Sequence, residues 1–596
     1  MPPWESLSIM DSAKTDNRLL QGIGASAGIA IGQVKITDRS RVAVTEATVA
    51  RAEIPAELER FRKGLERAKA ELRALRENIA TKRGEEHLHL IDTHLLLLED
   101  IMLIGETSAL IENEGINAEG ALKRTLQKLK EFFSGIEDEY LRERSADVET
   151  VVERILRNMV GKKQESITAF EGKVIVVAHD LSPADILQID KSTVIGFVTD
   201  MGGKTSHSAI LARALEIPAV VGMERITGEI RDGEIVIIDG ATGTVIVNPD
   251  QNTFQDYLRR KLHYEYVERE LLKLTDLPAV TIDGHSISLK GNVEFLEEVP
   301  SLKRHGAEGI GLYRTEMLFF NRDTLPDEEE LFDAYAAVVR AMAPAPVTIR
   351  TLDVGGDKVL TDLNLGDEMN PALGVRAIRL SLRQPETFKT QLRAILRSSA
   401  LGKVRIFFPM ISGVGEVRAA KAFVAEVKAE LRAAAVPFDE QIEIGIMIEI
   451  PSAVVIADLL AREVDFFSVG TNDLIQYSLA IDRTNEHLSS LYEPLHPAIL
   501  RSLKMVVDAA HAAGIDACMF GEMAGDPEYL PILLGLGFDE LSMNAVSIPR
   551  VKNILRRCTR KEAEEVAAHA LTYPTAQEVE SYLKSVIVSR FTESID

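Results

Sequence analysis

The chain has 596 residues, more than a single hydrophobic core supports, so we expect two or three domains. Hydrophobic residues make up 46% and charged residues 27%, which excludes disorder as the main state. The 92 acidic residues outnumber the 68 basic ones, and the net charge of −24 argues against nucleic acid or an anionic membrane as partner and favours a basic protein.

Two further features bear on where the protein works. Only two cysteines, Cys518 and Cys558, are present, so no disulfide framework is expected. Residues 1–17 are polar, lack the pattern of a signal peptide and are expected to form a disordered tail. No apolar run approaches the ~20 residues that span a bilayer. We therefore expect a cytoplasmic protein.

The first 250 residues combine two sequence patterns, one strand-like and one helical. Residues 20–34 are rich in Gly and Ala and predict a turn leading into a short strand. From about residue 53 to 160, apolar residues recur every three or four positions, which predicts long amphipathic helices. Strand-like runs return at 174–178, 194–198 and 235–238. The pattern predicts a helical subdomain (46–164) inserted into an α/β domain (18–45 and 165–250).

The second half of the chain alternates strand-like and helical runs. Residues 251–278 are charged and predict a helical linker. Between 279 and 596, eight strand-like runs are each followed by a helical pattern, which is typical of a (β/α)8 TIM-type barrel. The predicted strands are 287–292, 309–313, 347–351, 404–408, 442–449, 464–469, 515–520 and 540–543. Chemistry in such barrels lies at the carboxyl ends of the strands. Those ends carry Arg314, Arg350, Glu449, Asn472, Asp473 and Glu522.

A glycine-rich segment, 202–213, follows a strand of the α/β domain and enters a helical pattern. His207 is expected in the first helical turn, where backbone N–H groups and the helix dipole favour an anion such as a phosphoryl group. The segment contains Gly-Lys-Thr, yet Val198 stands where a P-loop needs its first glycine, which excludes nucleotide binding there. For a histidine standing alone, packing beneath a helix would be the better explanation.

The longer segment 202–222 closely resembles the phosphohistidine signature of enzyme I of the bacterial sugar phosphotransferase system, pyruvate phosphate dikinase and phosphoenolpyruvate synthase. The last two families need a large ATP-binding domain, for which the chain has neither room nor motif. The resemblance to enzyme I covers Leu20 to Lys584 in the same domain order.

This resemblance implies a Mg-dependent phosphoenolpyruvate-protein phosphotransferase. His207 would take the phosphoryl group from phosphoenolpyruvate and pass it to the histidine-containing phosphocarrier protein HPr, docked on the helical subdomain. The α/β domain would be the phosphohistidine domain, and the barrel would bind phosphoenolpyruvate and pair into a homodimer.

The barrel segments that resemble enzyme I imply roles for particular residues. Arginines suit the phosphate and carboxylate of phosphoenolpyruvate, and Mg prefers oxygen ligands. Segments 306–316 and 349–358 imply that Arg314 and Arg350 clamp the phosphate, while 445–451 and 467–473 imply Glu449 and Asp473 as Mg ligands. Further substrate contacts are implied for Asn472, Asp473, Arg483, Lys358, Arg376 and, more weakly, Asn292.

One segment departs from the family pattern. The family protonates enolpyruvate from a cysteine placed directly before Gly-Glu, where this chain has Phe520. Cys518 lies two residues earlier and is expected on the same face of the strand, where it could be the catalytic acid or a buried core thiol. Glu522 or water are the other candidate acids. The change also leaves open a phosphocarrier or regulatory scaffold with impaired protonation.

Overall fold

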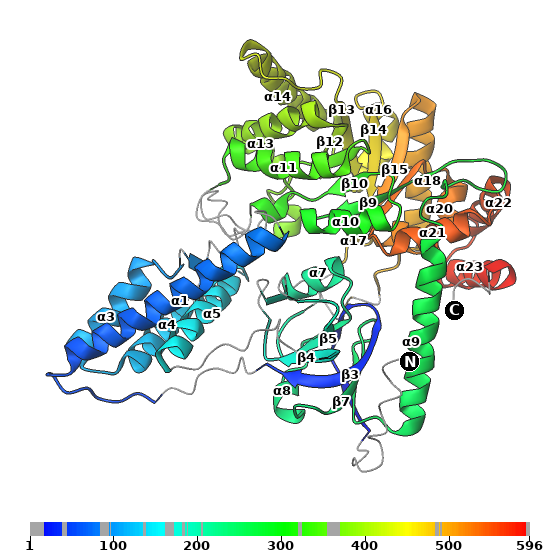
Figure 1. The fold of residues 1–596 in the computed structure, drawn as a ribbon. Coiled ribbons are helices and arrows are strands. Elements are labelled where there is room, and N and C mark those ends of the chain that lie inside the picture. The colour runs from blue at the N-terminus through cyan, green and yellow to red at the C-terminus, as the bar shows by residue number, and fades with distance from the viewer. Residues whose placement is uncertain are drawn as a thin grey trace. The chain divides into compact units, whose positions relative to one another are not determined.

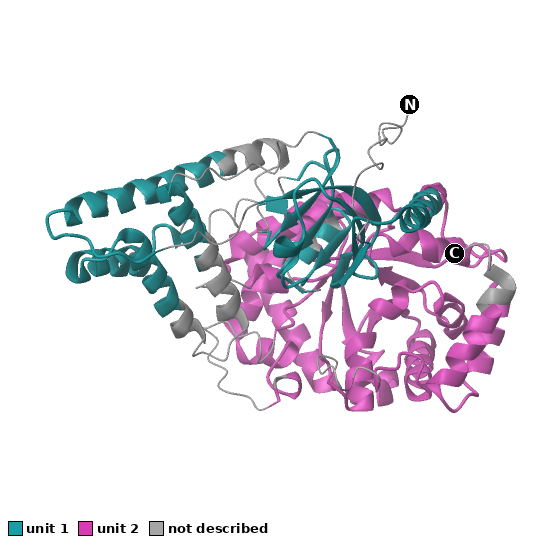
Figure 2. Ribbon diagram, turned by 90° about the horizontal axis from the view of Figure 1, so that it is seen from below, with its two compact units in different colours: residues 1–268 teal, residues 269–596 magenta. Residues whose placement is uncertain are grey.

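The structure of the protein is a computed structural model. It describes residues 17–37, 45–83, 94–95, 97–134, 139–160, 172–181, 185–186, 189–203, 207–319, 325–354, 370–482, 488 and 491–591. The chain forms two compact units, residues 1–268 and 269–596 (Figure 2). None of the described helices is long and apolar enough to cross a membrane.

Unit 1 contains an eight-stranded sheet in the order β1-β8-β7-β3-β4-β5-β6-β2. Figure 1 labels β3, β4, β5 and β7 of this sheet. Its strands are β1 (Arg18–Gln21), β2 (Ile23–Ser26), β3 (Ile29–Ile36), β4 (Val174–Ala178), β5 (Val194–Thr199), β6 (Ala219–Val221), β7 (Ile235–Asp239) and β8 (Thr244–Val247). Alternate residues of β4 face opposite sides, so Val176 joins the apolar core with α7 (His207–Ala214) and Val177 the core with α8 (Ile226–Glu229).

The prediction of one short strand in residues 20–34 is wrong, because three strands lie between Arg18 and Ile36. β1 pairs with β8, and β2 pairs with β6, more than 190 residues later in the chain. These short edge strands depend on distant partners, and so the local Gly-rich pattern does not disclose them.

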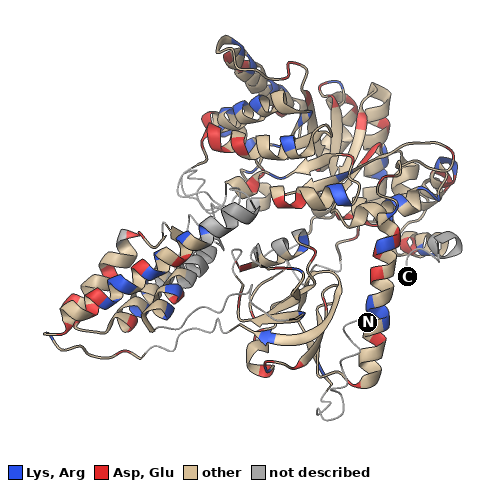
Figure 3. Cartoon of the chain, viewed as in Figure 1, with Lys and Arg blue, Asp and Glu red and all other residues tan. Residues whose placement is uncertain are grey.

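The helical block lies between β3 and β4, which are parallel neighbours in the sheet, so it is an insertion as the sequence predicts. Its helices are α1 (Ile54–Arg83), α3 (Ile101–Glu114), α4 (Ala118–Ser134) and α5 (Glu139–Val160), and they share one apolar core. Asp100 caps the amides of Met102 and Leu103, and α3 ends at the left-handed Gly115. Acidic and basic residues intermingle over these helices (Figure 3).

Unit 2 is a closed barrel of eight parallel strands, as the sequence predicts. The strands are β9 (Ser288–Val293), β10 (Ile310–Tyr313), β11 (Val347–Arg350), β12 (Val404–Phe408), β13 (Glu443–Ile448), β14 (Phe466–Gly470), β15 (Asp516–Phe520) and β16 (Glu540–Met543). The barrel closes where β16 pairs with β9. The charged segment before it forms the single helix α9 (Gln251–Leu272). Apolar runs buried on both faces are expected of parallel strands, and this is why all eight were predictable.

Helices follow the strands and cover the barrel (Figure 1). They are α10 (Val299–Arg304), α11 (Glu328–Met342), α12 (Ile378–Arg383), α13 (Pro385–Ser398), α14 (Val414–Ala433), α15 (Pro451–Val455), α16 (Ala457–Leu460), α17 (Thr471–Leu479), α18 (Pro497–Ala513), α19 (Glu522–Gly525), α20 (Leu530–Leu536), α21 (Ser547–Leu555), α22 (Arg560–Ala570) and α23 (Ala576–Phe591). Their inner faces and the outer faces of the strands share the main apolar core.

The interior of the barrel holds a buried ionic cluster near the amino ends of the strands. Glu540, the first residue of β16, accepts from Arg405 over 2.8 and 2.9 Å and from Lys290. All three side chains are almost fully buried. Next to this cluster lies a small apolar cluster that contains Leu312, Phe407, Met447, Phe466, Cys518 and Phe520. The interior is therefore filled, and open chemistry is confined to the carboxyl ends of the strands.

Candidate active site at the carboxyl ends of the barrel strands

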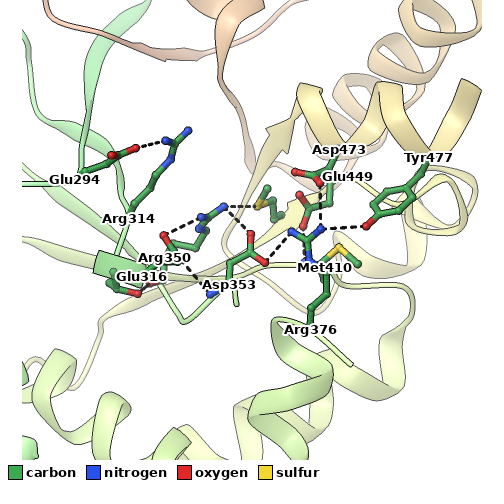
Figure 4. A network of polar contacts seen from close by, with 12 residues as sticks. Glu294, Arg314, Glu316, Arg350, Asp353, Arg376, Met410, Glu449, Asp473 and Tyr477 are labelled. Carbon is green, nitrogen blue, oxygen red and sulfur yellow. Dashed lines mark hydrogen bonds and ion pairs between the residues drawn. The ribbon is translucent and has the colours of Figure 1, made fainter. Parts of the chain in front are cut away.

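Three arginines gather at the carboxyl ends of the first strands, each beside carboxylates (Figure 4). Arg314 directly follows β10 and pairs with Glu294, and both side chains are partly exposed. Arg350, the last residue of β11, is buried. Its Nη2 lies 3.1 Å from Glu316 and its Nη1 lies 3.0 Å from Asp353. Burial alone would lower the pKa of Arg350, but these two carboxylates outweigh it and raise the pKa.

Arg376 comes from the segment before α12 and joins the arginine group to the next strands. Its Nη2 lies 3.0 Å from Asp353, and its Nη1 lies 3.4 Å from Asp473 and 3.2 Å from the hydroxyl of Tyr477. Burial opposes its charge, yet Asp353 and Asp473 raise its pKa. Arg350, Asp353, Arg376 and Asp473 thus form a continuous chain of ion pairs across the mouth of the barrel (Figure 4).

Glu449 directly follows β13 and is fully buried. One carboxylate oxygen accepts a hydrogen bond from the amide of Met410, and the other, Oε2, is buried with no hydrogen-bond partner. Burial raises the pKa of Glu449 well above its usual value, and the negative charges of Asp473 and Asp353 raise it further. A buried carboxylate oxygen without a partner is costly, and a cation would satisfy it.

The end of β14 places further polar groups beside Glu449. Asp473 lies in the first turn of α17, and Asn472 accepts a hydrogen bond from Tyr492 over 2.9 Å. Gly470, the last residue of β14, is required here, because a Cβ would lie 2.5 Å from Met447 Cε and 3.0 Å from Glu449 Oε2. The same Cβ would lie 3.3 Å from Phe520 Cζ, so the tip of the Phe520 ring reaches this part of the mouth.

The structure brings together Arg314, Arg350, Arg376, Glu449, Asn472 and Asp473 in one barrel mouth. Asn292 lies on β9 and accepts from Ser542 over 2.7 Å. Lys358 and Arg483 lie outside the described residues. His207 is the first residue of α7 in unit 1, where the sequence predicts it, and its side chain is outside the description.

Cys518 and Phe520 face the barrel interior together, as the alternation along the strand predicts. Cys518 is 2% exposed, and burial, followed by the charge of Glu540, raises the pKa of its thiol well above the usual value. It pairs in register with Glu540, in the layer beside the ionic cluster. Phe520 stands on the mouth side of Cys518 and packs against Phe407 with ring centroids 6.0 Å apart. This placement favours the interpretation of Cys518 as a buried core thiol. Glu522, the other candidate acid in the chain, is exposed at the start of α19.

Sequence reasoning missed the carboxylates that organise the arginines, namely Glu294, Glu316 and Asp353. Glu316 and Asp353 stand within the segments 306–316 and 349–358, two and three residues after Arg314 and Arg350, so position near a strand end was the available signal. Tyr477 and Tyr492 were also missed, since nothing in their local sequence marks them. Among the described residues, no group of three or more His, Cys, Asp or Glu side chains could hold a metal ion by itself.

Comparisons with known proteins match the whole architecture. Three family models fit: the N-terminal domain of PEP-utilising enzymes at residues 21–144, their mobile domain at 170–243 and their PEP-binding domain at 268–560. The fold, the site and these matches define a PEP-utilising enzyme.

Full-length relatives narrow this class. The phosphoenolpyruvate-protein phosphotransferase of Priestia megaterium is 44% identical over 566 residues, covering 95% of this chain and 98% of that protein. The Bacillus subtilis protein of the same name is 44% identical over 565 residues, covering 95% and 99%. The Haemophilus influenzae protein is 42% identical over 570 residues, covering 96% and 99%. The chain belongs to the phosphoenolpyruvate-protein phosphotransferase family, enzyme I of the sugar phosphotransferase system.

Proposed function

We propose that the chain transfers the phosphoryl group of phosphoenolpyruvate to His207 and then to a histidine-containing phosphocarrier protein, HPr. The observation that carries this proposal is the barrel mouth, where three guanidinium groups lie beside a buried carboxylate oxygen that has no partner. Guanidinium groups suit a phosphate and a carboxylate, and oxygen ligands suit a hard divalent cation. The names of the full-length relatives support the same activity.

In this proposal Arg314 and Arg350 bind the phosphate, and Arg376 and Asn472 contact the substrate from the other side of the mouth. Arg314 is the most accessible of the three described arginines, because its pair with Glu294 is partly exposed, and so its partner can be exchanged for an anion at small cost. Lys358 and Arg483, from segments outside the described residues, are proposed to add further contacts to the phosphate.

Glu449 and Asp473 are proposed to hold Mg. The fit rests on the buried Oε2 of Glu449, which lacks a partner, and on the proximity of Asp473, whose charge contributes to the raised pKa of Glu449. Mg usually takes one or two carboxylates and completes its coordination with water and substrate phosphate, so two protein ligands suffice. When bound, Mg supplies positive charge that stabilises the transferring phosphoryl group.

The charge of the described site supports a cation for a second reason. The three arginines face five carboxylates: Glu294, Glu316, Asp353, Glu449 and Asp473. This set carries two more negative charges than positive ones when all are ionised. A phosphoenolpyruvate anion would be repelled, and a divalent cation would remove the excess.

In the transfer step, a ring nitrogen of His207 attacks phosphorus, the bond from phosphorus to the enol oxygen breaks, and a phosphorus–nitrogen bond forms. The arginines neutralise charge on the phosphoryl oxygens, and pyruvate leaves as its enolate. The start of α7 supports His207 as the acceptor, because the positive end of the helix dipole favours a phosphoryl group. The enolate carbon then takes a proton, and we propose water or Glu522 as its source, with the catalytic role of Cys518 kept as the alternative.

We also propose a homodimer formed through unit 2. Val455, Leu459 and Met505 expose large apolar side chains on α15, α16 and α18, and α18 contacts both of the other helices. Sedimentation of the full chain at increasing concentration tests this, and a monomer at all concentrations with phosphoenolpyruvate and Mg present would contradict it.

The central test is incubation of the protein with phosphoenolpyruvate and Mg, followed by intact-mass and peptide analysis. One phosphoryl group at His207 is expected, and His207→Ala should abolish it, while His263→Ala on the exposed face of α9 should not. Phosphorylated HPr should also label His207. A label that survives in His207→Ala would refute the proposal. Labelling that leaves enolpyruvate, which the enzyme does not convert to pyruvate, would favour the phosphocarrier scaffold instead.

A further inference from the structure

Asp353 has no assigned role, yet it is the residue on which two of the site's arginines converge. Its side chain is 4% exposed and lies three residues beyond Arg350, the end of β11. Oδ2 lies 3.0 Å from Nη1 of Arg350, and Oδ1 lies 3.0 Å from Nη2 of Arg376. Each carboxylate oxygen therefore serves a different guanidinium group, from segments 26 residues apart in the chain.

Asp353 is itself held in place. Its backbone amide donates to Oε1 of Glu316 over 3.1 Å, and Oε2 of the same glutamate lies 3.1 Å from Nη2 of Arg350. The next residue, Val354, accepts from the amide of Ala377 over 3.0 Å, which ties the segment of Arg376 to the segment of Asp353. Ala377 adopts a φ of 53°, a conformation that non-glycine residues hold only where their surroundings require it. The carboxylate of Asp353 is thus held in one position by its own segment, and it orients the guanidinium groups of Arg350 and Arg376.

The charge of Asp353 opposes the binding of an anion. It adds to the excess of negative charge at the mouth and helps to raise the pKa of Glu449. Without Asp353, Arg350 would keep its pair with Glu316 and Arg376 its contacts with Asp473 and Tyr477, but no carboxylate would fix the two guanidinium groups relative to each other. Holding a guanidinium in one orientation removes an entropic cost from substrate binding and from the transition state. Orientation is therefore the contribution that offsets the unfavourable charge.

We propose that Asp353 is a positioning residue that sets Arg350 and Arg376 in one geometry for the phosphoryl group of phosphoenolpyruvate. This inference rests on the proposed function of the barrel mouth. It assigns Asp353 no contact with the substrate, and its effect passes through the two arginines.

The test uses the full chain with Asp353→Asn and Asp353→Glu. The first keeps the shape and removes the charge, and the second keeps the charge and moves it by one methylene. Asp508→Asn on α18 is the matched control, because Asp508 is 59% exposed and pairs with Lys504 one turn earlier on the same helix, away from the barrel mouth. Initial rates of pyruvate formation against phosphoenolpyruvate, at saturating Mg and with excess unphosphorylated HPr to take the phosphoryl group from His207, give kcat and KM. Circular dichroism with thermal unfolding checks that each variant folds.

Both variants of Asp353 should lower kcat/KM by at least about tenfold, the scale of lost orientation in an active site, while Asp508→Asn matches the wild type. Transfer from phosphorylated HPr to His207 should be unchanged. A second measurement adds Arg376→Lys, alone and with Asp353→Asn. If Asp353 acts through Arg376, the double variant should lose much less than the product of the two single losses.

Three results would overturn the inference. Wild-type kcat/KM in Asp353→Glu would mean that charge alone matters. Tighter binding of phosphoenolpyruvate with unchanged kcat in Asp353→Asn would mean that Asp353 only repels the substrate. Fully multiplicative losses in the double variant would mean that Asp353 and Arg376 act independently. Failure of the wild type to form pyruvate from phosphoenolpyruvate would instead refute the proposed function.

Discussion

The amide of Met410 donates a hydrogen bond to Oε1 of Glu449, and Met410 holds a left-handed φ of 59° in doing so. Such a conformation costs a non-glycine residue on the order of 1 kcal/mol or more and persists only where the surroundings enforce it. The result is a carboxylate fixed by one oxygen, with the other, Oε2, buried and without a partner.

The fixed carboxylate of Glu449 predicts the effect of Glu449→Gln. This substitution keeps the shape of the side chain and removes the negative charge that we propose binds Mg. Phosphorylation of His207 from phosphoenolpyruvate should fall at least about a hundredfold, because charge stabilisation of a phosphoryl transition state is worth several kcal/mol. Transfer from phosphorylated HPr should persist, since it needs no phosphoenolpyruvate site. Intact-mass labelling measures both reactions. Glu440→Gln, an exposed partner of Arg432, is the control, and loss of both reactions in Glu449→Gln would contradict separate sites.

Phe520 and Cys518 allow a test of how enolpyruvate is protonated. Phe520→Cys places a thiol on the mouth side of the buried Cys518, and we expect it to raise the rate of pyruvate formation while single-turnover labelling of His207 stays unchanged. Cys518→Ser should leave pyruvate formation within about twofold of the wild type, because a buried thiol with a raised pKa is poorly placed to exchange protons. A coupled pyruvate assay measures the rate. A clear fall in Cys518→Ser with labelling intact would make Cys518 the acid.

Glu540 predicts a stability effect without a direct effect on the site. Burial opposes its charge, but Arg405 and Lys290 lower its pKa. Glu540→Gln leaves two buried cations without a counter-charge and should destabilise unit 2 by roughly 3–5 kcal/mol, as for other broken buried pairs. Glu564→Gln, which breaks the exposed pair with Arg560, should cost less than about 1 kcal/mol. Chemical denaturation of both variants measures the difference, and equal midpoints would contradict the importance of the cluster.

The lowered pKa of Glu540 also predicts how the stability of unit 2 changes with pH. Its contribution is present above the ordinary carboxyl pKa and is lost as the pH falls toward its lower folded value. Below about pH 4.5 the wild type should therefore lose stability more steeply than Glu540→Gln, which cannot take up this proton.

The pKa of Glu298 is shifted in the opposite direction from that of Glu540, so its contribution to stability depends on pH in the opposite sense. Burial raises the pKa of Glu298 to about 7. The hydrogen bonds that its Oε2 accepts from the amides of Glu294 and Phe295 act in the opposite direction but do not outweigh burial. A carboxyl whose pKa is higher in the folded state stabilises the fold while protonated, and this stabilisation is lost as the pH rises through about 7. Glu298→Gln stays neutral, so its unfolding midpoint should fall less than that of the wild type between about pH 5.5 and 8.

The control for Glu298 is Glu440→Gln, whose pKa is lowered by Arg432 and which should not alter the dependence in this range. Thermal unfolding at a series of pH values measures the midpoints. Parallel curves for the wild type and Glu298→Gln would show that Glu298 is ionised in the fold at all of these pH values.

Much of the fold was predictable because its signals are local. The strands of the barrel are short apolar runs buried on both faces, and Val404–Phe408 and Glu540–Met543 were predicted with the bounds that the structure has. Arg350 and Glu449 were predicted to lie at the barrel mouth because each stands at the carboxyl end of a predicted strand. Short strands such as Ala219–Val221 were missed, since three residues carry no periodicity and the strand exists through its partners Ile23–Ser26 and Phe197–Val198 on either side.

The sequence by itself determined the inserted helical block, the eight barrel strands and the set of charged residues at the strand ends, because hydrophobic periodicity and chain order are properties of neighbouring residues. Only the tertiary structure decided which of those charges meet. Asp353 bridges Arg350 and Arg376, Glu540 lies against Lys290 across 250 positions of sequence, and Oε2 of Glu449 is left without a partner. Closure of the barrel brings distant strand ends within hydrogen-bond reach, and Coulomb and hydrogen-bond energies depend on distance in space and not along the chain.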